Sequence, residues 1–210
     1  KLIFIANPNN PTGTLIKKKV LKDFLDNVPE SIVVVLDEAY DEYLNESLKS
    51  DSFGWLNNYK NLIVSRSFSK AYGLAGLRIG YGVSSPELIE LMNRVRQPFN
   101  VNHLAQVSAT ASLKDRDFIK ESRIDNNIGM KQLTDAFKSL DLEFIPSYGN
   151  FVSFKLEDEK TAMMYYQHLL NNGVIVRPIA NYDLPKFLRV SVGLEHENDT
   201  FIKYLSNCNI

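Results

Sequence analysis

The feature that most constrains the fold is the run Ile32–Leu36, five consecutive apolar residues of which four are β-branched. Such a run is typical of a central strand in a parallel sheet, where both faces are covered. Asp37 follows directly, so its carboxylate is expected at the carboxyl end of that strand, where open α/β sheets bind ligands. A carboxylate there needs a partner, and a protonated ring nitrogen is one. The alternative is that Asp37 caps the next helix.

Strands and helices alternate along the first half of the chain. Strands are predicted near residues 1–6, 32–37, 62–66 and 79–83. Helices are predicted near 17–27 and 86–95, the second opened by Pro86. This alternation predicts right-handed crossovers and a mostly parallel sheet, hence an α/β fold.

The pattern changes near residue 141, where a smaller α+β domain is predicted. Its strands are expected near 143–146, 150–156, 174–177 and 187–191, and its helices near 159–172 and 195–207. Before it, Asn102 is expected to cap a helix, which is followed by a longer helical stretch to about 139. We therefore predict a large domain over 1–110 and a small C-terminal domain over 111–210.

The segment Ser67–Gly80 carries the strongest chemical signal. Lys70 follows Ser67 and Ser69, small residues come next, and Arg78 lies eight positions on. A lysine among small residues can be approached by a flat ligand and can form an imine with an aldehyde. Hydroxyls and a guanidinium nearby can hold a phosphate. The pattern predicts a pyridoxal-phosphate lysine with its phosphate site, and the alternative is a solvated surface lysine.

A rigid turn follows the first predicted strand. In Asn7–Gly13, two prolines and a glycine end the strand and restrict the backbone. Such a turn can aim the Asn10 amide at a ligand, and an ordinary surface turn is the alternative.

These three clusters together resemble the fold-type-I pyridoxal-phosphate aminotransferases of class I/II. Three later segments resemble, among these, the histidinol-phosphate aminotransferase family: 96–102, 173–178 and 187–193. Threonine-phosphate decarboxylases and related aminotransferases share parts of this narrower pattern. The resemblance runs over essentially the whole chain.

The resemblance implies cofactor-binding roles for seven residues. Lys70 would bind the cofactor aldehyde and carry a proton, and Asp37 would pair with the pyridine nitrogen. Tyr40 and Asn10 would hydrogen-bond the phenolic oxygen of the ring. The cofactor phosphate would be bound by Ser67, Ser69 and Arg78.

The resemblance also implies three substrate-binding residues. Arg189 would hold the substrate α-carboxylate, because its planar fork matches two oxygens at once. Asn150 would lie beside substrate and cofactor, and Arg177 would meet the phosphate of the substrate. For Arg177 and Arg189, an exposed strand arginine is the alternative.

The implied activity is the transfer of an amino group from L-histidinol phosphate to 2-oxoglutarate in histidine biosynthesis, by a homodimer with ping-pong kinetics. Another aminotransferase, a pyridoxal-phosphate-dependent phospho-amino-acid decarboxylase, or an inactive fragment are the alternatives. The last arises because the chain starts at Lys1, inside the strand that leads to the Asn7–Gly13 turn. The resemblance thus leads us to expect an N-terminally truncated sequence.

Composition narrows the partners to small molecules. A net charge of -1 gives no attraction to nucleic acid or to an anionic membrane, and no apolar run could span a bilayer. The single cysteine, Cys208, fits a reducing, cytoplasmic compartment. No metal site is expected, because the three histidines, His103, His168 and His196, lack ligand spacing.

Overall fold

The computed structural model describes residues 1–208 and divides into two compact units. Unit 1 comprises Lys1–Pro8 and Leu15–Glu121, and unit 2 comprises Asn9–Thr14 and the chain from Ser122 on. The turn that carries Asn10 therefore groups with the C-terminal part of the chain rather than with the strand before it. The domain boundary that we place between residues 110 and 111 stays a prediction.

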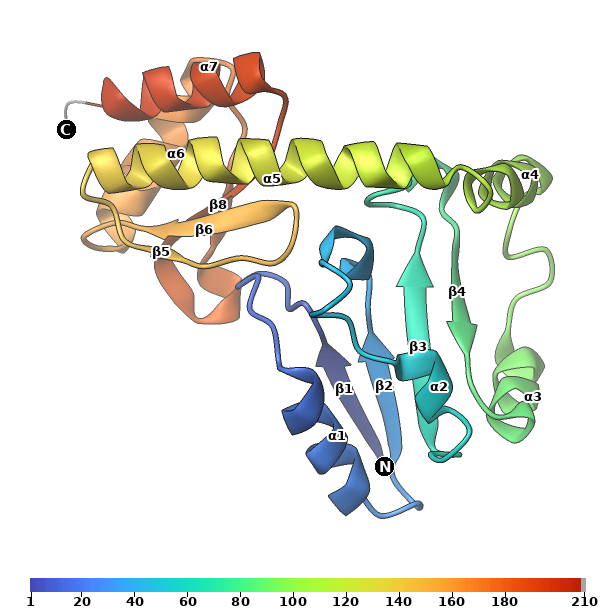
Figure 1. Cartoon of the computed structure of the whole chain (residues 1–210). Helices are drawn as coiled ribbons and strands as arrows, with labels where there is room; N and C mark the ends of the chain where they lie inside the picture. Colours follow the sequence, from blue (N-terminus) through green and yellow to red (C-terminus); the bar gives the residue numbers. More distant parts are fainter. Residues whose placement is uncertain (209–210) are drawn as a thin grey trace. The chain divides into compact units, whose positions relative to one another are not determined.

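Unit 1 is built on a four-stranded sheet in the order β1-β2-β3-β4 (Figure 1). The strands are β1 (Leu2–Ala6), β2 (Val33–Asp37), β3 (Leu62–Ser67) and β4 (Gly80–Val83). The first three are parallel, as predicted, and β4 runs antiparallel to β3. Gly80 permits this close pairing, since a Cβ there would lie 2.7 Å from the Arg66 carbonyl oxygen. The predicted α/β class is confirmed.

One face of this sheet carries the hydrophobic core of unit 1. The helices packed on it are α1 (Lys18–Asn27) and α2 (Ser52–Trp55), which contribute Leu21, Leu25 and Trp55. The strands contribute Val34, Leu36, Leu62 and Val64, all at alternate positions. Because side chains alternate across a strand, Asp37, Ser65 and Ser67 belong to the opposite face.

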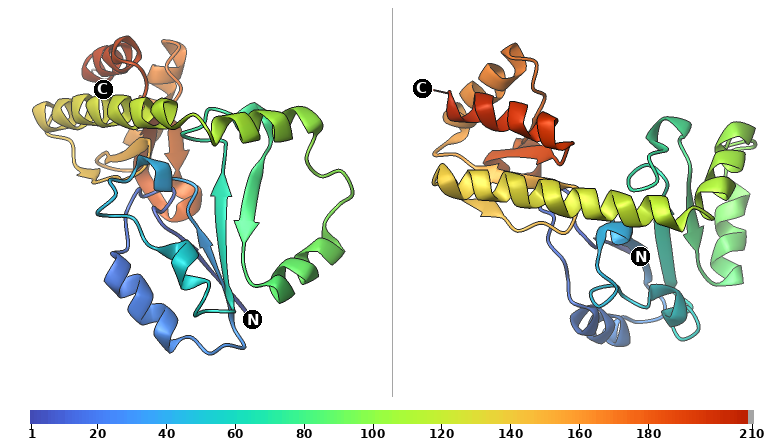
Figure 2. Two further views of the ribbon diagram at one scale, coloured as in Figure 1. Left: turned by 45° about the vertical axis from the view of Figure 1, so that its right-hand side comes forward. Right: turned by 45° about the horizontal axis from the view of Figure 1, so that its top comes forward.

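The predicted helix start at Pro86 and the predicted Asn102 cap are both confirmed. Helix α3 (Pro86–Val95) has the Ser85 hydroxyl as its cap, and α4 (His103–Ser112) has the Asn102 side chain. Figure 2 shows α5 (Arg116–Ser139) as one continuous helix, and the division between the units falls within it. Short 3-10 turns are η1 (Asp41–Tyr43), η2 (Ala75–Leu77) and η3 (Ala180–Tyr182).

Unit 2 contains an antiparallel sheet in the order β5-β6-β8-β7. Its strands are β5 (Phe144–Ile145), β6 (Phe151–Lys155), β7 (Arg177–Ile179) and β8 (Leu184–Ser191). The predicted strand at 174–177 was wrong in position. The amides of Gly173 and Val174 still close the preceding helix, donating to Leu170 O at 3.0 Å and Leu169 O at 2.9 Å, so the strand begins only at Arg177.

Three helices cover one face of the unit 2 sheet. They are α5, α6 (Glu159–Asn171) and α7 (Glu195–Ser206), and they pack on Val152, Phe154, Leu188 and Val190. By alternation, Phe151, Ser153 and Arg189 belong to the opposite face of β6 and β8. That face is therefore available for polar contacts.

Candidate functional site

Two parallel strands of unit 1 end in polar residues on the same face. Asp37 closes β2 and pairs in register with Ser65 of β3, and Ser67 closes β3 two residues later. The Asp37 carboxylate is exposed and accepts the Ala39 N–H at 3.1 Å through Oδ1. This single backbone contact orients the carboxylate and leaves Oδ2 for another donor.

Lys70 lies beside an aromatic ring. Its Nζ is 5.4 Å from the centre of the Tyr40 ring, which is buried and follows Asp37 by three residues. Among the described residues, no carboxylate lies within salt-bridge distance of Lys70. The loop is held by the Gly73 amide, which donates to Lys70 O at 2.9 Å, and by buried Phe68. The structure thus brings the predicted lysine and tyrosine together.

The predicted phosphate residues are ordered by local contacts. Ser67 Oγ accepts the Ser69 N–H at 3.0 Å, so the two serines form one turn. Arg78 has a left-handed backbone (φ 57°) and donates from Nη1 to Ala75 O at 2.8 Å. A left-handed arginine is uncommon, and such conformations gather where a side chain must be aimed.

The polar side chains at these strand ends of unit 1 match one kind of ligand. A lysine amine without an ion pair suits an aldehyde, an oriented carboxylate at a strand end suits a basic ring nitrogen, and hydroxyls with an arginine suit a phosphate. A flat heterocycle that carries all three groups matches these residues chemically.

In unit 2, Arg189 stands at the centre of a polar row across the sheet. It pairs in register with Ser153 of β6 and with Arg177 of β7, so the two arginines are direct cross-strand neighbours. The Arg189 guanidinium lies 4.9 Å from the centre of the Phe151 ring and donates to Asn10 Oδ1. Like charges opposite one another repel, and an anion bound to this face would relieve that repulsion.

The Asn9–Thr14 turn is attached to the same face of the unit 2 sheet. The buried Ser153 hydroxyl donates to Pro11 O at 2.8 Å, and the Tyr148 amide donates to Gly13 O at 2.8 Å. Gly13 has φ +75°, and a Cβ there would lie 2.9 Å from Ser147 Cα. Only glycine meets both requirements, which explains the last residue of the sequence motif.

Asn150 is half-buried at the start of β6, and its carbonyl accepts the Val192 N–H at 2.8 Å. The neighbouring Gly149 carbonyl accepts Asn126 Nδ2 at 3.2 Å. Asn10, Asn150, Arg177 and Arg189 thus all belong to unit 2, whereas the other predicted site residues belong to unit 1.

Sequence reasoning missed a buried charged cluster in unit 1. Arg66 contacts three carboxylates, those of Glu38, Asp41 and Glu42. Burial raises the pKa of all three carboxyls, and burial with the charge of Glu42 raises the pKa of Tyr72 to about 12. The signal was present: Arg66 stands at a core-facing position of β3, two residues after Val64.

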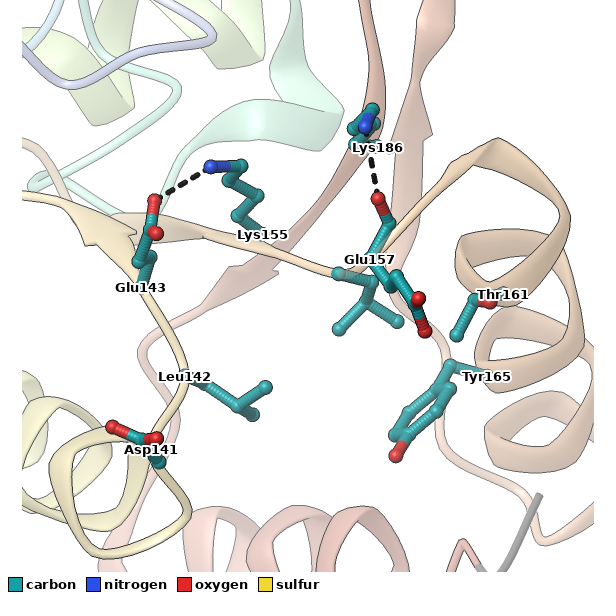
Figure 3. A pocket seen from close by; sticks show the side chains of 9 residues that line it. Asp141, Leu142, Glu143, Lys155, Glu157, Thr161, Tyr165 and Lys186 are labelled. Atoms are coloured by element: carbon teal, nitrogen blue, oxygen red, sulfur yellow. Dashed lines mark hydrogen bonds and ion pairs between the residues drawn. The ribbon is translucent and has the colours of Figure 1, made fainter.

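Unit 2 also has an open hollow of about 460 Å³ (Figure 3). Both of its amines are already engaged: Lys155 Nζ lies 2.7 Å from Glu143 Oε2, and Lys186 Nζ donates to Glu157 O at 2.9 Å. Over residues 1–208 there is no group of three His, Cys, Asp or Glu placed to hold a metal ion. No helix in the same range is long and apolar enough to cross a membrane.

Comparison with known proteins gives one consistent result. Residues 1–205 match the family described as aminotransferase class I and II. The chain is 58% identical over 203 residues to a histidinol-phosphate aminotransferase of Methylobacillus flagellatus, covering 97% of this chain and 54% of the relative. It is 53% identical to histidinol-phosphate aminotransferase 1 of Cupriavidus pinatubonensis, covering 98% and 55%.

Solved structures agree with the sequence comparison. The histidinol-phosphate aminotransferase of Sinorhizobium meliloti, solved in complex with pyridoxal-5'-phosphate, has a TM-score of 0.92 at 29% identity and covers 99% of this chain and 56% of that one. The enzyme of that name from Clostridium acetobutylicum has a TM-score of 0.89 at 26% identity, covering 98% and 63%. The chain spans about half the length of the curated relatives it matches.

Proposed function

The chain belongs to the aminotransferase class I and II family, and we propose that the protein acts as a pyridoxal-phosphate-dependent aminotransferase. The proposed reaction converts L-histidinol phosphate and 2-oxoglutarate to imidazole acetol phosphate and L-glutamate, a step of histidine biosynthesis. The names of the relatives at 50–58% identity support this substrate. The observation in the structure that carries the proposal is the Lys70 amine beside the Tyr40 ring, with Asp37 at the neighbouring strand end.

The residues of unit 1 would hold the cofactor and move the proton. When bound, pyridoxal phosphate supplies an electron-accepting ring that weakens the Cα–H bond of the amino donor. Asp37 would keep the ring nitrogen protonated, and Ser67, Ser69 and Arg78 would hold the phosphate. Lys70 Nζ would hold the cofactor through its aldehyde and, as a free amine, would take the Cα proton of the amino donor as a general base. Because the two substrates would use the same residues in turn, we expect ping-pong kinetics.

The residues of unit 2 would bind the anionic ends of the two substrates. 2-Oxoglutarate has an α-carboxylate, whereas histidinol phosphate has a phosphate ester on the corresponding carbon. Arg189 suits the carboxylate because its fork can donate to both oxygens, and Arg177, directly across from it, suits the phosphate. Asn10 accepts a hydrogen bond from the Arg189 guanidinium and so orients it. Asn150 would lie beside the bound substrate.

The first prediction tests the reaction itself. The complete reading frame that contains this chain is supplied with pyridoxal phosphate, L-histidinol phosphate and 2-oxoglutarate, and glutamate is measured. Glutamate formation should fall by roughly three orders of magnitude or more in Lys70→Ala, because the anchoring amine and proton carrier are lost together. Lys60→Ala, an exposed lysine of unit 1, is the matched control and should keep full activity.

Two results would contradict this proposal in different ways. If the protein converts other amino donors but not histidinol phosphate, the proposed cofactor chemistry stands and the proposed substrate is wrong. Release of CO₂ in place of glutamate formation would identify a decarboxylase instead.

We also infer that the enzyme is a cytoplasmic homodimer. A single, buried cysteine, Cys208, is typical of a reducing compartment. The family resemblance supports the dimer, because its members build their sites at subunit interfaces. Light scattering on the purified complete protein should give twice the subunit mass, and a monomer with full activity would contradict the dimer.

A further inference from the structure

The buried charges of unit 1 form one compact group, which we name the Arg66 cluster: Arg66, Glu38, Asp41 and Glu42. Arg66 Nη2 and Nε lie 2.6 and 2.9 Å from Glu38 Oε2, and Nη1 lies 2.8 Å from Asp41 Oδ2. The contact from Nη1 to Glu42 Oε1 is longer, at 3.5 Å. The side chains are at most 12% exposed, so water screens these contacts poorly.

Other side chains complete the surroundings of the cluster. The Ser52 hydroxyl of α2 donates to Glu38 Oε2 at 2.8 Å, and the Phe53 ring lies 4.9 Å from the Arg66 guanidinium. Lys49 Nζ is 4.0 Å from Asp41 Oδ2. Tyr72 and Tyr81 face the same charges, and burial is the main cause that raises the pKa of each. The Arg66 cluster is therefore part of a larger network of ion pairs and hydrogen bonds and is more than an isolated ion pair.

The members of the cluster are direct chain neighbours of the proposed site residues. Glu38 follows Asp37, Asp41 follows Tyr40, and Arg66 precedes Ser67. The Glu38 amide donates to Ser65 O at 2.9 Å, which continues the β2–β3 ladder past the end of β2. By alternation, Glu38 and Arg66 belong to the core-facing side of the sheet, and Asp37 and Ser67 to the other.

The charge balance argues against a purely stabilising role. Three carboxylates share one guanidinium, and Glu42 Oε2 is buried without a hydrogen-bond partner in the described part of the chain. Desolvation of buried ion groups commonly cancels their attraction, so such clusters contribute little net stability. What a rigid, forked guanidinium does provide is fixed geometry between the chain segments it joins.

We propose that Arg66 is a positioning residue. By holding Glu38 and Asp41, it fixes the positions of the end of β2 and of the η1 turn relative to the end of β3. As a result, Asp37, Tyr40 and Lys70 face one bound cofactor. This inference rests on the proposed function. Arg66 touches neither substrate nor cofactor, and acts through the backbone of its neighbours. Two short contacts to Glu38 and one to Asp41 carry the effect, while Glu42 contributes little.

The test measures cofactor binding and not turnover. The complete reading frame and its variants are titrated with pyridoxal phosphate, and the dissociation constant and the pH midpoint of the visible band of the lysine-bound cofactor are recorded. Lys70→Ala identifies that band. In Arg66→Met we expect the dissociation constant to rise roughly ten-fold or more and the midpoint to shift, because the site residues lose their alignment. Arg66→Lys should lie between, since an ammonium cannot contact both carboxylates as the fork does.

Two further variants test the positioning role of Arg66 if Arg66→Met does not fold. Glu38→Gln preserves size but removes the anion that two guanidinium nitrogens hold, and should change both readouts in the same direction. Glu42→Gln should leave both readouts within about two-fold of the unchanged protein, because its contact is long. Arg94→Met, which removes an exposed pair with Glu90 on α3, is the surface control.

The outcomes separate the two levels of inference. If folded Arg66→Met or Glu38→Gln melts earlier but binds the cofactor with unchanged affinity and midpoint, Arg66 is structural only and the positioning role is overturned. If the unchanged protein forms no band that Lys70→Ala abolishes, the proposed function fails, and the positioning role with it.

Discussion

Glu42 has a buried carboxylate of which one oxygen, Oε2, has no hydrogen-bond partner in residues 1–208. Burial is the largest cause and raises its pKa; a hydrogen bond to its own backbone and the charge of Arg66 oppose the rise, and the charge of Asp41 adds to it. A group with a raised pKa in the folded state binds its proton more tightly there than in the unfolded chain. Its contribution to stability therefore falls as the pH rises from the ordinary carboxyl range through the raised pKa.

This residue gives a prediction for stability. Glu42→Gln should raise the free energy of unfolding by roughly 1 kcal/mol at pH 7 to 8, because a neutral amide avoids burying a poorly partnered charge. The gain should shrink as the pH falls toward and below the ordinary carboxyl pKa, because the carboxyl then becomes protonated in both states. Urea unfolding at several pH values measures this, with exposed Glu121→Gln as control. A gain that does not change with pH would contradict the titration as its cause.

Asn102 shows how a local sequence signal can specify the end of an element. Its side-chain oxygen accepts the Ala105 N–H at 2.8 Å, as the sequence predicted for a helix cap. The helix that was predicted after Asn102 and the longer helical stretch that follows it are both present. Helix α4 ends at Ser112 and α5 begins at Arg116, where Asp115 Oδ1 accepts the Phe118 N–H at 3.1 Å. Asp115 thus provides a second cap, one that apolar periodicity does not indicate.

Removing the Asn102 cap should destabilise helix α4. Asn102→Ala should lower the free energy of unfolding by about 1 kcal/mol, because the Ala105 amide loses its acceptor at the first turn of α4. Asn102→Asp keeps an acceptor oxygen and should lose clearly less. Thermal and urea unfolding compare the three proteins. Equal losses in the alanine and aspartate variants would show that the side-chain donation to Leu77 O at 3.3 Å matters more than the cap.

The whole molecule joins segments that are far apart in the sequence. Ser153 Oγ donates to Pro11 O across 142 positions, and the Asn9–Thr14 turn groups with unit 2 although unit 1 residues flank it on both sides. Sequence patterns predicted a ligand-facing turn at Asn10. They did not predict that the turn would be attached to the sheet that carries Ser153 and Arg189, because no local pattern encodes those contacts.

This attachment is testable by hydrogen exchange. Ser153→Ala removes a buried donor and leaves the Pro11 carbonyl unsatisfied, so the turn should open more often. Exchange of the Gly13 and Tyr148 amides should accelerate several-fold more than that of Leu205 in the core of α7. Ser139→Ala, at the exposed end of α5, is the control. Unchanged exchange at Gly13 and Tyr148 would show that the turn is held by other contacts.

The local features of this protein follow from short stretches of its sequence. Apolar periodicity located most strands and helices, cap residues marked helix starts, and the Ser67–Gly80 and Asn7–Gly13 motifs indicated the cofactor chemistry, because each signal lies within a few neighbouring residues. Tertiary structure decided what depends on distant partners: the antiparallel β4, the later start of β7, the attachment of Asn10 to Arg189, and the burial of Glu38, Asp41 and Glu42 around Arg66. From sequence alone, charged residues are expected to be exposed. Only the register of β2 against β3 brings the three carboxylates and Arg66 together away from water.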